Sequence, residues 1–489
     1  REFSLLKKLL YSLLLFLLMA FLFASLNLYK PLQKIKVNNS LINDVSLIKI
    51  GNHTFRDLNK NNLLDVYEDH RLSSEIRANE LVDRMTTEEK VGQMFHPPFT
   101  LNPDLLMLIY EIAIRGNKLT EAKIVFDNIT HFNLYGNPSP TELAKKINYF
   151  QEIASKTRLG IPITISSDPI HEVPKGGGVA SFSVDGYSKW PSQLGFAATN
   201  DPSIIKNFAE IAREEYLATG IRTALHPMSD LATEPRWARN FGTFGSNADL
   251  SSKMTLAYMD GFQGKNISEK SVHTMVKHFP GGGPQEKGLD PHLYSGRNQN
   301  YPGDNFDYHL LPFKDAIKNN LKVIMPYYGI PVGITNEDVA MGYNEYILSD
   351  LLREELGFDG VVCSDWGIIS GRHWGVDNLT IKERYKKSFL AGIDQYGGED
   401  DPEHIINLIS DGEISTERIN SSVKRILINK FDLGLFDNPY VDEEMVKERV
   451  ATDKNIKFGL DAQRKSIVLL ENDGILPLKN KQRIFVDGL

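Results

Sequence analysis

A repeated alternation of short apolar runs and helix-like stretches most constrains how this chain can fold. The runs are rich in β-branched residues and each ends in polar residues: IPITISSD, IRTALHPMSD, TMVKHFP, LKVIMPYY, GVVCSDW and AGIDQYGG. Helix-like stretches such as PSIIKNFAEIAREEYLAT and NEYILSDLLREEL lie between them. This alternation predicts a parallel α/β sheet, and so many units within about 350 residues favour a closed (β/α)8 barrel of the TIM type.

The polar residues that end these runs are candidates for an active site. In a TIM barrel the active site lies at the carboxyl ends of the strands. Asp168, Lys277, His278, Tyr328 and Asp365 each stand at the end of one run or just after it. We therefore expect these five side chains, far apart in the sequence, to converge.

The regions around the barrel are predicted from changes in the sequence pattern. We expect a polar amino-terminal segment over residues 31–75, the catalytic barrel over 76–435 and a linker over 436–465. The stretch AQRKSIVLLENDGILPL is typical of a helix and a hairpin. Residues 466–489 are therefore predicted to begin a second α/β domain.

The first 30 residues have the layout of an export signal. Lys7 and Lys8 precede an almost unbroken apolar run from Leu9 to Leu26. This run is about as long as a membrane-spanning helix, so an uncleaved anchor is the alternative. The segment predicts an exported protein, periplasmic or extracellular, that contacts a membrane only here.

Charge and histidine spacing narrow the classes of function. The net charge is -8, and the basic residues are scattered rather than grouped, so no nucleic-acid partner is expected. The twelve histidines contain no H-x-H or H-E-x-x-H pattern, which argues against a catalytic zinc site.

The segment GFDGVVCSDWG places a carboxylate and an indole at the end of a buried strand. Asp365 could simply cap a helix and Trp366 could belong to the core, which are common roles for these residues. The segment is, however, similar to the nucleophile signature of glycoside hydrolase family 3, in which the Asp before Trp forms the glycosyl-enzyme intermediate. A retaining glycosidase needs an ionised carboxylate beneath the anomeric carbon and an acid about 5 to 5.5 Å away, and the resemblance assigns the first role to Asp365. Trp366 could then stack on a sugar ring.

Further segments resemble the same family in the same order. VKHFPGGG resembles the Lys-His pair that holds sugar hydroxyls, which corresponds to Lys277 and His278. ISSDPIHE puts Asp168 where the family has an Asp that accepts hydrogen bonds from the sugar. VIMPYYGIPVG puts Tyr328 in the place of a Tyr beside the nucleophile, with Tyr327 as the close alternative.

One segment departs from the family pattern while resembling it. EPRWARNFGTFG is similar to the P-R-W-G-R element, with Arg239 in the place of the sugar-binding Arg. Ala238 replaces a Gly, and Gly242 stands where many members have a Glu. These differences leave the predicted fold intact and make the substrate less certain.

The resemblance implies an exo-acting, retaining β-glycosidase, a β-glucosidase or exo-β-glucanase that takes a β-linked oligosaccharide or aryl glycoside and needs no cofactor for catalysis. It also implies a second domain of the α/β sandwich type. A β-xylosidase or a β-N-acetylhexosaminidase of the family is the alternative with the same chemistry. A sugar-binding protein without catalysis and a metal-dependent hydrolase on the same barrel are alternatives of other classes.

The general acid/base has no clear counterpart in this sequence. Most two-domain members carry it as a Glu on the second domain, which is expected to lie outside this sequence. The one-domain β-N-acetylhexosaminidases use an Asp-His pair in the loop after the Lys-His strand, and Asp290 and His292 in GLDPH resemble that pair. An imidazole that titrates near neutrality could supply the proton. The longer spacing leaves a plain loop histidine as the alternative.

Before the barrel, DLNKNNLLDVYE has the pattern of a twelve-residue calcium loop. Asn62 stands in place of the usual Gly, which is tolerable because Asn enters left-handed backbone more easily than most residues. A polar surface turn is the alternative, and calcium would have a structural role here. The predicted ligands are the side chains of Asp57, Asn59, Asn61, Asp65 and Glu68, with the main chain of Leu63.

Overall fold

The computed structural model of the chain describes residues 7, 11, 14, 30–101, 118–172, 184–479 and 483–485. Its centre is a seven-stranded parallel sheet in the order β12-β10-β8-β7-β6-β5-β4. The strands of the described chain are β1 (Ser46–Ile50), β2 (His53–Asp57), β3 (Phe95–His96), β4 (Pro98–Leu101), β5 (His131–Gly136), β6 (Thr164–Ser167), β7 (Ile221–Ala224), β8 (His273–Phe279), β9 (Asn298–Gln299), β10 (Val323–Pro326), β11 (Ile330–Pro331), β12 (Val361–Val362) and β13 (Tyr396–Gly397).

The sheet closes into a barrel through β13. This strand pairs in parallel with β3, and a parallel bridge between Cys363 and Gln395 joins it to the end of β12. Only Pro97 separates β3 from β4, and its carbonyl accepts a hydrogen bond from the backbone nitrogen of Asn133 at 3.0 Å. The TIM-type barrel predicted from the alternation is confirmed.

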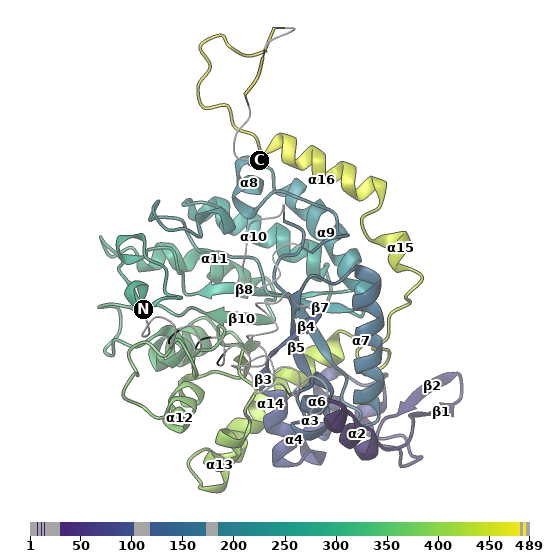
Figure 1. The fold of residues 1–489 in the computed structure, drawn as a ribbon. Coiled ribbons are helices and arrows are strands. Elements are labelled where there is room, and N and C mark those ends of the chain that lie inside the picture. Colours follow the sequence, from purple (N-terminus) through teal and green to yellow (C-terminus); the bar gives the residue numbers. More distant parts are fainter. Residues whose placement is uncertain are drawn as a thin grey trace.

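Helices surround the barrel strands (Figure 1). They are α2 (Lys30–Ser40), α3 (Ser74–Arg84), α4 (Thr87–Gln93), α6 (Thr120–Phe126), α7 (Pro140–Ser155), α8 (Gln193–Ala198), α9 (Pro202–Thr219), α10 (Ala248–Gln263), α11 (Phe306–Lys318), α12 (Ile381–Ala391), α13 (Glu403–Ser410), α14 (Thr416–Asp432), α15 (Val446–Arg449) and α16 (Asp453–Lys465), with a π-helix η7 (Tyr346–Glu355) and the 3-10 turns η2 (Val66–Glu68), η3 (Asn240–Gly242), η4 (Glu286–Gly288), η5 (Tyr294–Gly296) and η6 (Met341–Tyr343).

Helix α9 shows why the sequence produces these elements. The Asp201 side chain accepts a hydrogen bond from the backbone of Ser203, and Pro202 occupies the first turn, where no amide hydrogen is needed. The helix ends at Gly220, whose φ of 89° suits a residue without Cβ. The next residue begins β7, which is buried along its whole length. One helix-strand unit therefore follows from its local sequence.

Both ends of the described chain lie outside the barrel. The antiparallel hairpin of β1 and β2 projects near α2, and the residues after α16 project at the other side of the molecule (Figure 1). The hairpin expected within residues 466–489 is not seen: α16 ends at Lys465, and no strand forms in 466–479 or 483–485. Leu470, for example, is 93% exposed, because no neighbouring strand covers it.

The predicted export signal lies almost entirely outside the described residues, which include only Lys7, Tyr11, Leu14 and Lys30 of that segment. Among the residues that the structure describes, no helix has the length and apolar character to cross a membrane. Whether residues 1–30 form a cleaved signal or an anchor stays a prediction, as do the domain boundaries.

Candidate functional site

The residues expected at the strand ends do converge at the carboxyl end of the barrel. Asp168 directly follows β6, Lys277 and His278 belong to β8, Tyr328 follows β10, and Asp365 follows β12. All five side chains are buried. The contacts below link them into one cluster, which we call the catalytic-end cluster.

Asp365 has one oxygen engaged and one free. Its Oδ1 accepts a hydrogen bond from the backbone nitrogen of Trp366 at 2.8 Å. Its Oδ2 is buried and has no hydrogen-bond partner within the described chain, although Nε2 of His278 lies 3.7 Å away. A buried carboxylate oxygen without a donor is costly and therefore uncommon. This oxygen can act as an acceptor or as a nucleophile.

Lys277, the residue before His278, forms a buried ion pair with Asp168 at the same end of the barrel. The Lys277 Nζ lies 3.0 Å from Asp168 Oδ1, and both side chains are almost inaccessible. The amide of Asn133, on β5, donates to the other oxygen of Asp168 at 3.4 Å. The pair thus offers a cationic donor and an anionic acceptor side by side, a combination suited to sugar hydroxyls.

His278 lies between two carboxylates. Its Nδ1 is 2.8 Å from Asp230 Oδ2, while its Nε2 faces Asp365. The ring packs against Tyr327, with 4.2 Å between ring centroids. Burial lowers the pKa of His278, and the charge of Asp230 raises it by less.

Arg239 is joined to the cluster through Tyr327. Its guanidinium donates to the Tyr327 hydroxyl at 3.1 Å, and that hydroxyl donates to Asp290 Oδ2 at 3.3 Å. Burial lowers the pKa of Arg239, but the facing Tyr327, Asp290 and Asp365 raise it above its ordinary value. The side chain is therefore a permanent cation near Asp365.

Tyr328 and Trp366 complete the cluster around the nucleophile candidate. The Tyr328 hydroxyl donates to the Trp366 carbonyl at 2.8 Å, and the guanidinium of Arg372 lies 5.0 Å from the Tyr328 ring centroid. Burial raises the pKa of Tyr328, and the neighbouring Asp365 raises it further. The Trp366 indole nitrogen is buried without a hydrogen-bond partner in the described chain. Tyr328 thus lies next to Asp365, whereas Tyr327 connects to Arg239 and His278.

Asp290 and His292 form a pair that borders the cluster. Nδ1 of His292 lies 2.5 Å from Asp290 Oδ1, and the ring meets that of Tyr328 edge-on at 4.8 Å between centroids. Asp290 also accepts a hydrogen bond from the indole of Trp237 at 2.8 Å. Burial raises the pKa of Asp290, but the bond to His292 and the charge of Arg239 hold it well below its usual range. The His292 ring thus has one nitrogen anchored on Asp290, and its side chain is 39% exposed.

The predicted calcium loop is folded around its own polar side chains. The amides of Asn59 and Asn61 both donate to Asp65 Oδ2, at 2.6 and 2.7 Å. Asn62 has a φ of 64°, the left-handed backbone expected of it. The Glu68 carboxylate accepts hydrogen bonds from the backbone nitrogens of Leu58, Asn59 and Asp65. Burial raises the pKa of Glu68.

No group of three or more His, Cys, Asp or Glu side chains within the described ranges is arranged to hold a metal ion. The loop's three carboxylates, Asp57, Asp65 and Glu68, are therefore not arranged as such a group. Both oxygens of Asp57 and both oxygens of Glu68 accept backbone hydrogen bonds instead, so an ion would have to displace these contacts.

Asp230 and Asn133 are polar residues of the cluster that sequence reasoning missed. Asp230 follows β7 in LHPMSD, and Asn133 lies inside β5. Asp230 ends one of the apolar runs, so its position was a usable signal. Asn133 gave none, because a single Asn within a strand does not show which neighbour it meets.

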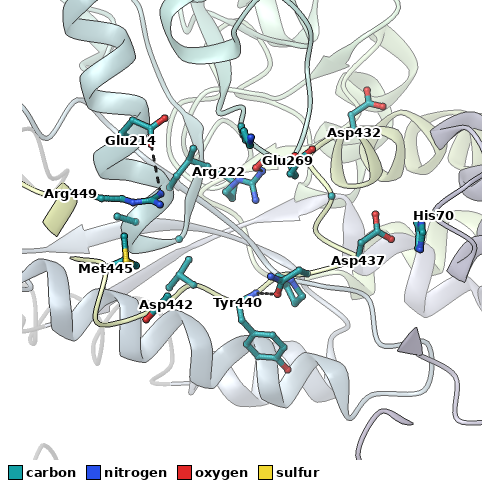
Figure 2. Close-up of a pocket in the computed structure, with 18 of the residues that line it drawn as sticks. His70, Glu214, Arg222, Glu269, Asp432, Asp437, Tyr440, Asp442, Met445 and Arg449 are labelled. Atoms are coloured by element: carbon teal, nitrogen blue, oxygen red, sulfur yellow. Dashed lines mark hydrogen bonds and ion pairs between the residues drawn. The ribbon is translucent and has the colours of Figure 1, made fainter. Parts of the chain in front are cut away.

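A cavity of about 1010 Å³ lies at the opposite end of the barrel, away from this cluster. It borders Gly220, just before β7, and the chain after α14, so it faces the amino ends of the strands. Figure 2 shows side chains of both charges around it, among them Arg222, Glu269 and Asp437. None of the predicted sugar-binding residues lines it.

Comparison with known sequences points to one family. The family model described as "Glycosyl hydrolase family 3 N terminal domain" matches residues 86–428. "Probable beta-glucosidase C" of Aspergillus oryzae is 45% identical over 447 residues, which cover 88% of this chain and 69% of that protein. "Periplasmic beta-glucosidase/beta-xylosidase" of Dickeya chrysanthemi is 38% identical over 470 residues, 91% of this chain and 71% of the relative.

Solved structures agree with this. The β-glucosidase of Listeria innocua in complex with glucose matches with a TM-score of 0.68 and 28% identity, over 83% of this chain and 53% of that one. A β-glucosidase of Erythrobacter marinus has the same TM-score at 24% identity, over 84% of this chain and 52% of that one, and shows likeness of fold alone. The chain thus spans about half the length of these solved structures.

Proposed function

Because this chain belongs to glycosyl hydrolase family 3, we propose that it carries the catalytic barrel of a retaining, exo-acting β-glycosidase that releases terminal β-D-glucosyl residues. Membership of the family makes it a glycoside hydrolase. The observation that carries the proposal is the state of Asp365, a buried carboxylate at a strand end with one oxygen unpaired and with His278 and the charge of Arg239 near it. The Oδ1 atom caps the backbone of Trp366, which leaves Oδ2 available for chemistry.

In the proposed reaction Asp365 Oδ2 attacks the anomeric carbon and the bond to the leaving oxygen breaks. The leaving oxygen takes a proton from a general acid, and a glycosyl ester of Asp365 remains. Water then attacks the ester, loses its proton to the same acid/base group and restores the carboxylate, so that the sugar leaves with its original configuration.

The other residues of the cluster are proposed to bind the terminal sugar. Lys277 donates a hydrogen bond to one sugar hydroxyl, and Asp168 accepts one from a hydroxyl. Because the two charges balance each other, the pair can bind a neutral sugar without leaving a net buried charge. His278 and Arg239 hold further hydroxyls, and the positive charge of Arg239 keeps Asp365 ionised. Trp366 offers an apolar face and Tyr328 fixes the loop behind it.

His292, with Asp290 as its partner, is our candidate for an acid/base within the barrel. The edge-on contact between His292 and Tyr328 supports this role, because Tyr328 adjoins the nucleophile. A Glu on a second domain is the competing candidate. In that case His292 would be a loop histidine without a chemical role.

We infer the sugar and the location of the protein from the names of its relatives. Glucose is favoured because the fungal and Listeria relatives are named β-glucosidases, and xylose is the alternative because the Dickeya relative is named for both sugars. An N-acetylglucosaminyl substrate is a further alternative, since a Cellulomonas fimi relative is named "Beta-N-acetylglucosaminidase/beta-glucosidase". We also propose export, because the Dickeya relative is named periplasmic.

We further propose that the loop of Asp57, Asn59, Asn61, Leu63, Asp65 and Glu68 binds a structural calcium ion. The convergence of both amides on Asp65 supports it, because a half-turn of each amide would place its oxygen beside this carboxylate, in exchange for the bonds that the oxygens accept from the backbone of Asn61 and Leu63. No catalytic step needs this ion, and catalysis itself needs no cofactor.

The test of the main proposal is covalent trapping with 2-deoxy-2-fluoro-β-glucosyl fluoride, whose activated leaving group needs little acid assistance. We expect one adduct by mass spectrometry, on the peptide that holds Asp365. Asp365→Asn should form none, whereas the control Asp359→Asn, at an exposed position on the same segment, should still react. If the folded protein forms no adduct with this probe or with its xylosyl and N-acetylglucosaminyl counterparts, the proposal is overturned in favour of a sugar-binding protein.

A further inference from the structure

Asp230 is a fully buried carboxylate that the proposed reaction leaves without a role. It follows β7 and is inaccessible to solvent. Its Oδ2 accepts hydrogen bonds from both Nδ1 and the backbone nitrogen of His278, at 2.8 and 3.2 Å, and its Oδ1 accepts one from the backbone nitrogen of Gly282. Burying a charge is costly unless hydrogen bonds replace the lost water. Three donors to one carboxylate provide that replacement.

The chain around Asp230 forms a close-fitting cradle. A Cβ on Gly282 would lie 2.6 Å from Asp230 Oδ1 and 2.6 Å from a Tyr327 ring carbon, so the turn after β8 can approach only because this residue is glycine. Backbone hydrogen bonds also join the segment that carries Asp230 to β8. The backbone nitrogen of Ser229 donates to the Lys277 carbonyl at 2.6 Å, and the backbone nitrogen of Lys277 donates to the Pro227 carbonyl at 3.0 Å. The carboxylate therefore has a fixed position relative to the His278 ring.

This contact decides which nitrogen of His278 carries a proton. A carboxylate only accepts hydrogen bonds, so Nδ1 must be the donor to Asp230. Burial lowers the pKa of His278, and the groups that face the ring are Asp230, Arg239, Asp365 and Tyr327. In the neutral ring Nε2 then carries a lone pair and no proton. It lies 3.7 Å from the unpaired Oδ2 of Asp365. Two acceptors so close together call for a donor between them.

We propose that Asp230 is a positioning residue that holds His278 in the Nδ1-protonated tautomer, so that Nε2 accepts a hydrogen bond from a sugar hydroxyl beside Asp365. This inference rests on the proposed function of Asp365, and Asp230 touches no substrate atom. The orienting carboxylate fixes both the tautomer and the plane of the imidazole, as partners of functional histidines do elsewhere.

The decisive variant is Asp230→Asn, because asparagine has the same shape but only one acceptor oxygen. If that oxygen faces Gly282, the amide nitrogen faces Nδ1, so the proton must move to Nε2 and the backbone nitrogen of His278 loses its acceptor. If it faces His278, the Gly282 nitrogen is left unpaired. We expect the first arrangement, because the Nε2 proton then gains Asp365 as an acceptor.

The measurement is the ring ¹⁵N spectrum of histidine-labelled protein without ligand, with the signals of His278 identified by their loss in His278→Gln. We expect an unprotonated Nε2 in the unaltered protein and a protonated Nε2 in Asp230→Asn. We also expect kcat/KM to fall between about 10- and 100-fold, through KM as well as kcat. Glu234→Gln, on the same loop but paired with the exposed Arg236, should change neither quantity.

The outcomes separate this inference from the proposed function. A protonated Nε2 in the unaltered protein overturns the inference, and this result does not require the variant to fold. A trapped adduct at Asp365 together with unchanged kcat/KM in Asp230→Asn also overturns it, while the proposed function stands. The expected tautomers without any adduct would support the positioning contact and count against the proposed function.

Discussion

Two buried lysines at opposite ends of the barrel show how differently one side chain can be used. Lys277, at the carboxyl ends of the strands, pairs with the Asp168 carboxylate at 3.0 Å. Lys430, from α14, enters the amino end and donates only to neutral acceptors: the carbonyls of Thr130 and Pro162 and the hydroxyl of Thr164. Burial lowers the pKa of Lys430 well below its ordinary value, and no carboxylate in the described part of the chain pairs with it.

Other charged side chains at the two ends of the barrel show the same contrast. At the catalytic end, carboxylates face cations and Asp365 keeps an unpaired oxygen. At the opposite end, one nitrogen of Arg222 donates to three carbonyls, those of Glu269, Ser271 and Leu433. The large cavity lies beside these structural bonds, so cavity size is a poor guide to chemistry in this molecule.

The largest effect that we predict on activity, apart from loss of the nucleophile, is that of Lys277→Met. It removes a sugar-binding donor and leaves Asp168 unbalanced, so we expect kcat/KM to fall by about 10²-fold or more. Steady-state kinetics with an aryl β-glucoside would measure it. Lys430→Met is the matched control at the other end, and we expect kcat/KM within about twofold of the unaltered protein once folding is verified. Equal losses in both variants would refute the contrast.

A smaller loss is expected from His292→Ala, and it should depend on the substrate. If His292 protonates the leaving oxygen, kcat should fall by about 10²-fold for a poor leaving group such as an alkyl alcohol and little for a dinitrophenol. Comparing a series of leaving groups would measure this dependence. A uniform loss across the series would contradict the acid role and favour an acid on another domain.

Lys430 should instead govern stability and its response to pH. Lys430→Met leaves buried acceptors unpaired and should lower the free energy of unfolding by about 2 kcal/mol at high pH. Between the lowered pKa of the folded state and the ordinary value near 10.4, the unfolded chain binds the extra proton, so stability gains from rising pH.

Denaturant titrations at pH 7 and 9 would check this effect. We expect the unaltered protein to gain stability relative to Lys430→Met, by at most about 1.4 kcal/mol per pH unit. Parallel pH dependences of the two proteins would mean that Lys430 stays charged, and the contrast with Lys277 would weaken.

The last prediction concerns the calcium loop, for which no effect on activity is expected; Thr54 and His70, on either side of the loop, line the cavity at the opposite end. Adding calcium to chelator-treated protein should raise the unfolding free energy by about 2.7 kcal/mol at a hundredfold excess over Kd, a shift in Tm of only a few degrees. Activity should not change. Asp65→Asn should lose the response and Asp83→Asn, at an exposed position on α3, should keep it. Isothermal calorimetry without heat of binding would refute the site.

Much of the catalytic end could be predicted because each residue stands at the end of its own strand. Asp168, Lys277 and Asp365 are found by locating apolar runs and reading the next polar residue, which is local information. The contact between Asp290 and His292 was also foreseeable from their spacing of two residues. The partner of Tyr327 was not, since Arg239 lies 88 residues away and reaches it only across the barrel.

The sequence by itself determined the alternation that builds the barrel and the residue types at the strand ends, because both depend on side chains within a few positions of one another. Only the tertiary structure decided which acceptors surround Lys277 and Lys430, and which nitrogen of His278 meets Asp230. Charge state and tautomer depend on the dielectric and the partners at a point in space, and those partners come from distant strands.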